Sequence, residues 1–172
     1  KMCDAFQIPL LLLCDCPGIM VGPEVEKTGL VRHAARMFVI GANIKVPSYM
    51  VILRKAYGLG AQAMGGGNHR LPAFVVAWPT SEFGGMGLEG QVKLGQRARL
   101  EAISDLGERQ AAYERMVEAA YNRGKGLNAG HVFEVDEVID PADTRMWLIA
   151  GMKAGAPLVH EPQLRAPIID AW

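Results

Sequence analysis

The amino-acid sequence predicts an α/β protein with a mostly parallel sheet, helices flanking that sheet, and a helical C-terminal region. Three continuous apolar runs of strand length carry this prediction, because strands buried on both faces of a parallel sheet are apolar throughout. Segments of helical or glycine-rich character separate the runs, which is the order expected of right-handed β-α-β crossovers. Beyond Thr80 the pattern becomes mostly helical.

The first apolar run, residues 8–14, ends at the rigid turn Asp15-Cys16-Pro17-Gly18. Open α/β sheets bind ligands at the carboxyl ends of their strands, so this turn is a candidate site. Gly22-Pro23 then opens a helix predicted from Glu24 and ended by Val46-Pro47, with an apolar stripe along one side. We expect the second half of this helix to be buried, because residues 37–42 are apolar on nearly every side.

The second and third runs, Tyr49–Arg54 and Ala73–Trp78, are predicted strands that enclose a glycine-rich stretch from Tyr57 to Gly67. That stretch predicts a helix of about two turns, because Gly65-Gly66-Gly67 interrupts any longer one. A second glycine-rich turn, Gly84–Gly90, again precedes a helix.

The C-terminal half contains two helix starts with recognisable capping residues. Asp105 with Glu108 three residues later resembles a capping box. The short strand Val138-Ile139 leads to Asp140-Pro141, where an N-cap and a first-turn proline predict a helix to about Met152. We expect residues 1–157 to form one domain and residues 158–172 to be an extended tail.

Composition excludes several classes of protein. Lysine plus arginine equals aspartate plus glutamate at 18 each, which argues against a nucleic-acid-binding protein. No apolar run approaches the roughly 20 residues of a membrane span, and no cluster has the spacing of a metal site. Three cysteines are too few for a disulfide framework, so a reducing compartment is expected. Because the first residue is Lys1, we expect this sequence to be a piece of a longer protein.

The strongest local feature is the turn from the second strand into Gly58-Leu59-Gly60. Glycines let a ligand oxygen approach the backbone closely, and the first amides of a helix lack partners inside that helix. Two such amides form an oxyanion hole, which contributes roughly 3 kcal/mol per donor in a transition state. A tight turn without any ligand is the equally simple interpretation from the residues alone.

Other chemistry is weakly indicated. The pattern Gly58-x-Gly60-x-x-Ala63 matches a dinucleotide fingerprint, but the helix after it is too short for a Rossmann crossover. Asp15 is a candidate acid or base, although capping of the following turn is the commoner role of such a residue. Cys14 and Cys16 have no cationic neighbour to activate a thiolate.

Several motifs, in order, resemble the carboxyltransferase β subunits of biotin-dependent acyl-CoA carboxylases, of the propionyl-CoA and methylcrotonoyl-CoA type. They extend from about Cys3 to Leu148 and read IPLLLLCDCPGIMVG, VRHAARM, VPSYMVILRKAYGLGAQAM, AWPTSEFGGMGLEG and VDEVIDPADTR. The resemblance covers most of the second of two crotonase-like domains, and it implies a crotonase-like ββα spiral.

The resemblance implies transfer of a carboxyl group from carboxybiotin, held on a partner carrier domain, to the α-carbon of an acyl-CoA. Carried over by position, the backbone amides of Leu59 and Gly60 form the oxyanion hole on the biotin side. The remaining implied site residues surround that turn: Tyr57, Gly58, Ala61, Gln62, Pro17, Gly18 and Gly87. Gln62 stands where several propionyl-type members have Asp, so propionyl-CoA is not assigned as the substrate.

The implied partners are acyl-CoA, a biotin carboxylase or carboxyl carrier subunit, the absent N-terminal carboxyltransferase domain, and further copies in a homo-oligomer. Neither a membrane nor a nucleic acid is expected as a partner, and the implied location is the bacterial cytoplasm or the mitochondrial matrix. Two alternatives stay open: a biotin-linked acyl-CoA decarboxylase subunit, and a non-catalytic fragment that only supplies an assembly surface.

Overall fold

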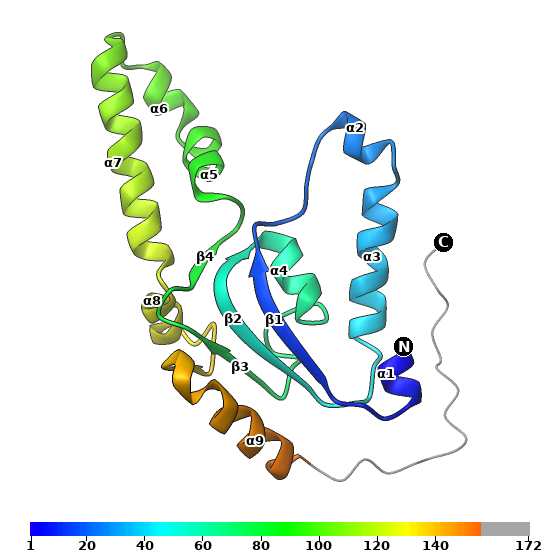
Figure 1. Cartoon of the computed structure of the whole chain (residues 1–172). Helices are drawn as coiled ribbons and strands as arrows, with labels where there is room; N and C mark the ends of the chain where they lie inside the picture. Colours follow the sequence, from blue (N-terminus) through cyan, green and yellow to red (C-terminus); the bar gives the residue numbers. More distant parts are fainter. Residues whose placement is uncertain (156–172) are drawn as a thin grey trace.

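A computed structural model of the chain describes residues 1–155, so the predicted tail at 158–172 lies outside the described residues. Its centre is a five-stranded sheet in which every strand pairing is parallel (Figure 1). The main strand order is β1-β2-β3-β5, and β4 pairs with the carboxyl end of β2. The strands are β1 (Leu10–Cys16), β2 (Ser48–Tyr57), β3 (Phe74–Ala77), β4 (Glu82–Gly84) and β5 (Glu137–Val138). The predicted parallel α/β class is therefore confirmed.

The core lies on both faces of β2, as its continuous apolar run predicted. The same prediction is wrong for β1, where Leu11 and Leu13 are 40% and 51% exposed because no described element covers that face. On one face of β2, Met50 and Ile52 pack with Cys14 of β1, and α4 covers this side. On the other face Tyr49 and Val51 pack beneath Trp147 of α9. The helices are α1 (Met2–Ala5), α2 (Pro23–Glu26), α3 (Leu30–Gly41), α4 (Gly58–Met64), α5 (Leu88–Gly95), α6 (Arg97–Glu101), α7 (Leu106–Gly124), α8 (Gly126–His131) and α9 (Thr144–Ala154).

The helix predicted from Glu24 to the Val46-Pro47 stop is wrong in two respects. It is broken between α2, which ends at Glu26, and α3, which begins after Gly29, whose φ of 74° is left-handed. The second half is also not buried: α3 contains no buried residue, and Met37 is 49% exposed. The physical reason is that α3 meets the rest of the described chain chiefly through α4 and the glycine loop after it, where Gly41 lies against Gly66.

The predicted capping residues are confirmed. Asp105 accepts a hydrogen bond from the Glu108 amide at 2.7 Å at the start of α7, and Asp140 accepts one from the Ala142 amide at 2.8 Å. The second cap opens a single 3₁₀ turn, Pro141–Asp143, before α9 begins. None of the helices within the described part of the chain is long and apolar enough to cross a membrane.

Helices α5, α6 and α7 form an arm that extends away from the sheet (Figure 1). A small core attaches this arm to the end of β2, since Tyr57 packs there with Leu88, Val92 and Ala120. The arm therefore joins the sheet directly beside the glycine-rich turn that the sequence singles out.

Candidate active site

Three segments meet where β2 gives way to α4. Strands β1 and β4 each pair in parallel with β2, so the carboxyl ends of all three strands lie at the same edge of the sheet. The segments that meet there are the turn after β1, the start of α4, and the loop between β4 and α5. The predicted turn is thus placed at the edge where this class of sheet binds ligands.

Close backbone contacts explain two of the glycines in the turn. Gly58 has a φ of 55°, and a Cβ at this position would lie 2.5 Å from the carbonyl oxygen of Gly85. A Cβ on Gly60 would lie 2.7 Å from the Sγ of Cys16 and 2.9 Å from the carbonyl carbon of Gly18. Side chains are therefore excluded at both positions by the neighbouring segments, and glycine is required to bring the segments together.

The backbone amides of Leu59 and Gly60 are free to act as donors. They are the second and third residues of α4, so they have no acceptor within the helix. Neither amide donates to another backbone group among residues 1–155. First-turn amides point toward the N-terminal end of their helix, which here is the side where Gly58 meets Gly85.

A cavity of about 490 Å³ opens beside Gly58, and Leu59 and Gly60 are not among the residues that line it. Polar and apolar groups both line it. Gly58 and Gln62, one helical turn apart on α4, are the two predicted site residues that line it. The other lining residues are Ala56, His69, Phe83, Gly84, Gly85, Leu88, Gln91, Ala120, Arg123, Gly124, Asn128, Ala129, Val132 and Glu134.

The structure distributes the remaining candidates around the turn. Ala61 is buried in the core below α4, whereas the Leu59 side chain is 60% exposed. Gly18, with a φ of 108°, lies against Gly60. Pro17 is exposed, and Gly87 is the N-cap of α5; neither lines the cavity.

Tyr57 fastens the end of β2 to β4. Its side chain is buried, and its hydroxyl donates to Oε2 of Glu82 at 2.7 Å. The pKa of the Tyr57 hydroxyl is raised above its ordinary value, mainly because the group is buried and secondly because it donates a hydrogen bond to Glu82. On the adjoining arm the hydroxyl of Tyr121 donates to Glu89.

Replacing Tyr57 with Phe is expected to lower the free energy of unfolding by about 1 kcal/mol near neutral pH, because one buried hydrogen bond is lost. The raised pKa means that the folded chain holds this proton more tightly than the unfolded chain does. Its contribution to stability is therefore complete below about pH 10 and falls as the pH rises further. Urea unfolding at about pH 8 and about pH 11 should show the difference between wild type and variant shrinking.

Tyr113→Phe is the matched control for this measurement, since its hydroxyl makes only a 3.4 Å contact with the Glu89 carbonyl oxygen. At pH 8, Tyr113→Phe should lower the free energy of unfolding by less than Tyr57→Phe does. An equal stability difference for Tyr57→Phe at both pH values would contradict the assignment of the raised pKa.

Asp15 and Cys14, which the sequence offered for acid–base and nucleophilic chemistry, do not line the cavity. Asp15 does not cap the turn that follows it; its carboxylate pairs with Arg54 at 3.0 Å and accepts from the Lys55 amide. The hydrogen bond from Arg54 is the main cause that lowers the pKa of Asp15. Burial raises the pKa of the Cys14 thiol to about 11. No group of three metal-binding side chains occurs within the described residues.

Sequence reasoning missed several residues that line the cavity. His69 was a loop residue in the sequence, and nothing in its neighbourhood indicated that it would lie beside Gln62 and Glu134. Strand β4 has only three residues and no apolar run, so Phe83 and Gly84 carried no signal of their position. Glu134 comes from a separate part of the chain, and only folding brings it here.

Comparisons with known proteins agree with this architecture. The profile of the carboxyl transferase domain family matches residues 1–158. The chain is 37% identical over 154 residues to the carboxyltransferase subunit of propionyl-CoA carboxylase from Haloferax mediterranei, covering 89% of this chain and 29% of that protein. It is also 37% identical over 154 residues to the methylmalonyl-CoA carboxyltransferase 12S subunit of Propionibacterium freudenreichii subsp. shermanii, with the same two coverages.

Solved structures show the same fold. A single-chain, multi-domain long-chain acyl-CoA carboxylase matches with a TM-score of 0.76 and 52% identity, over 87% of this chain and 15% of that one. The transcarboxylase 12S structure matches with a TM-score of 0.79 and 33% identity, over 96% of this chain and 32% of that one. The crotonase-like fold is thereby confirmed. The chain spans less than a third of its curated relatives' length, and it belongs to the carboxyl transferase domain family.

Proposed function

We propose that this chain supplies one half of the carboxyltransferase site of a biotin-dependent acyl-CoA carboxylase. The reaction moves a carboxyl group from carboxybiotin to the α-carbon of an acyl-CoA thioester. Membership of the carboxyl transferase domain family supports the reaction class. The single observation that supports a role for this half is the pair of free amides, Leu59 and Gly60, beside a cavity at the carboxyl edge of the sheet.

The residues around the turn fit a ureido group. A urea oxygen that gains negative charge needs hydrogen-bond donors, and two adjacent free amides are such donors. When bound, carboxybiotin supplies the carboxyl group that is transferred. The amides of Leu59 and Gly60 would hold the ureido oxygen, and they would do so without any side-chain acid.

The surrounding residues keep those two amides in place. The Tyr57 hydroxyl ties the end of β2 to β4, and Gly58 lets α4 approach the loop after β4. Gly60 packs against Gly18 of the turn after β1. We assign Tyr57, Gly58 and Gly18 to positioning of the turn, and Gln62 to the cavity wall beside the substrate. Ala61, Pro17 and Gly87 stay predictions from the resemblance.

The proposed partners follow from the same assignment. Biotin is carried by a separate carrier domain or subunit, and the enolate of the acyl-CoA is held by the N-terminal carboxyltransferase domain. The related transcarboxylase 12S protein assembles as a hexamer, which supports a homo-oligomer for the complete protein. A decarboxylase subunit would use the same half-site in the opposite direction.

The experiment is a carboxyl-transfer assay with the complete polypeptide and its carrier subunit. We expect acyl-CoA-dependent loss of labelled carboxyl from the carrier and formation of a carboxylated acyl-CoA. Running the assay from both sides distinguishes carboxylase from decarboxylase. Absence of transfer in both directions, with a panel of short, medium and long acyl groups, would reject the proposed reaction and favour the assembly-fragment alternative.

A further inference from the structure

Strand β2 is irregular at the point where it changes partners. Cys14 of β1 pairs with Ile52, and the next pair is Cys16 with Ala56. Asp15 alone therefore stands opposite three residues of β2. On its other edge, β2 stops pairing with β3 at Ile52 and pairs with β4 beyond the irregularity. A bulge of this kind bends its strand, and bulges are common beside active sites because they re-aim the residues that follow.

Two side chains bond to the backbone of this bulge, one from each edge of β2. The Asp15 carboxylate accepts a hydrogen bond from the Lys55 amide at 3.1 Å, and the Thr80 hydroxyl donates to the Leu53 carbonyl oxygen at 2.7 Å. The same carboxylate pairs with Arg54 at 3.0 Å, but both side chains are exposed, and exposed ion pairs contribute little stability. The two bonds to the backbone are therefore the contacts that hold the shape of the bulge.

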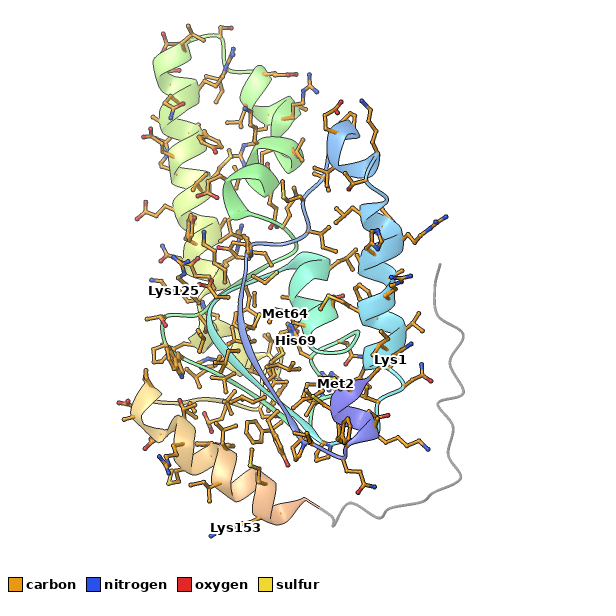
Figure 2. All side chains as sticks on the ribbon, turned by 45° about the vertical axis from the view of Figure 1, so that its right-hand side comes forward. Lys1, Met2, Met64, His69, Lys125 and Lys153 are labelled. Atoms are coloured by element: carbon orange, nitrogen blue, oxygen red, sulfur yellow. The ribbon has the colours of Figure 1, made fainter. Side chains whose placement is uncertain are left out.

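The bulge sets the direction of the end of β2 and of the turn that follows it. Beyond the bulge β2 pairs with β4, where Glu82 forms a backbone bridge with Lys125, which Figure 2 labels at the base of the arm. The segment directly after Asp15 reaches the turn itself, because a Cβ on Gly60 would lie 2.9 Å from the carbonyl carbon of Gly18. The Asp15 carboxylate thus joins the strand that leads into the turn to the segment that packs against it.

We propose that Asp15 and Thr80 are positioning residues of this half-site, which hold the bulge of β2 in the shape that places the amides of Leu59 and Gly60. This inference rests on the proposed function. Neither Asp15 nor Thr80 lines the cavity, so both act through the backbone and not on a substrate. Because the two amides stabilise charge that develops during transfer, a misplaced turn should lower kcat and change KM little.

The test compares Asp15→Ala with Asp15→Asn in the complete polypeptide with its carrier. Alanine removes the acceptor of the Lys55 amide, so we expect kcat to fall roughly tenfold, with KM for acyl-CoA within about twofold of wild type. Asparagine keeps a side-chain oxygen for that amide and loses only the ion pair with Arg54, so kcat should return to within about threefold of wild type. Equal losses in both variants would assign the effect to charge and overturn the inference.

Glu101→Ala is the matched control. It also breaks an exposed carboxylate–arginine pair, with Arg97 at 2.8 Å, but it lies on α6 in the arm and not at the bulge. We expect neither kcat nor KM to change in it. If Asp15→Ala turns over at the rate of this control while wild type transfers carboxyl groups, the inference is overturned and the proposed function survives.

The opposite edge of the bulge provides a second pair of variants, which keeps the test possible if Asp15→Ala does not fold. Thr80→Val has nearly the same shape but cannot donate to the Leu53 carbonyl oxygen, so kcat should fall in it as well. Thr80→Ser keeps the hydroxyl and should restore turnover. Wild-type kcat in Thr80→Val would overturn the role assigned to the bulge.

A further readout is independent of turnover. The Sγ of Cys16 lies where a Cβ on Gly60 would approach it to 2.7 Å, so this thiol reports whether the segment after Asp15 stays against the turn. Asp15→Ala should raise the rate at which iodoacetamide modifies Cys16, measured by mass spectrometry relative to Cys3 of the same molecules. An unchanged ratio would overturn the positioning role. A raised ratio in protein that shows no carboxyl transfer would support it while the proposed reaction failed.

Discussion

Replacing Leu59 with proline is expected to lower the rate of carboxyl transfer roughly 100- to 1,000-fold, because it deletes one of the two free amides at the turn. Proline is tolerated in the first turn of a helix, where the missing N–H has no intrahelical acceptor. The loss should therefore fall on kcat rather than on folding. Steady-state turnover with the complete polypeptide, alongside the melting temperature, separates the two effects.

Leu59→Ala is the control for the proline variant. The leucine side chain is 60% exposed, and alanine keeps the amide, so turnover should stay close to that of wild type. If Leu59→Pro folds and turns over at the wild-type rate, the amide of Leu59 does not stabilise charge. A loss in Leu59→Ala as large as in Leu59→Pro would instead assign the effect to the side chain.

Replacing Gly58 with alanine is expected to destabilise the chain by about 2–4 kcal/mol and to abolish most transfer. A φ of 55° is unfavourable for any residue with a Cβ, and that Cβ would lie 2.5 Å from the carbonyl oxygen of Gly85. Since the contact is with backbone, relief requires α4 and the loop after β4 to separate. The separation would widen the cavity and move the two amides. Chemical denaturation and a turnover assay measure the two consequences.

The opposite side of the same contact offers the matched control. A Cβ on Gly85 would meet nothing within 4 Å, and its φ is not in the left-handed region. Gly85→Ala should leave the free energy of unfolding near that of wild type. A Gly58→Ala variant as stable as Gly85→Ala would show that the close approach is not needed.

The elements that the sequence predicted well are those whose residues carry their own signal. Continuous apolar runs identified β1, β2 and β3. Burial on both faces is the reason for β2 and β3, whereas β1 has one exposed face that carries Leu11 and Leu13. Asp105 and Asp140 indicated the starts of α7 and of the turn before α9, because an aspartate side chain accepts a hydrogen bond from an amide two or three residues later. The short length of α4 was predicted from Gly65-Gly66-Gly67, which directly follow it in the sequence.

The misjudged elements depend on distant neighbours. Strand β4 exists because its three residues pair with the end of β2, which no local pattern indicates. The burial expected for the second half of α3 failed because helical apolarity does not say whether a partner covers the helix. His69 and Glu134 reach one cavity only because α4, β4 and α8 meet around it.

The amino-acid sequence alone determined the parallel α/β class, the family resemblance and the turn at Gly58-Leu59-Gly60, because apolar runs and glycines act on the backbone close to where they stand. Only the tertiary structure decided that Gly58 faces Gly85, that Gly60 faces Gly18, and that His69 and Glu134 line one cavity beside Gly58. Those features are contacts between segments far apart along the chain. Their geometry is fixed by how the strands pair and the helices pack, which short-range propensity does not encode.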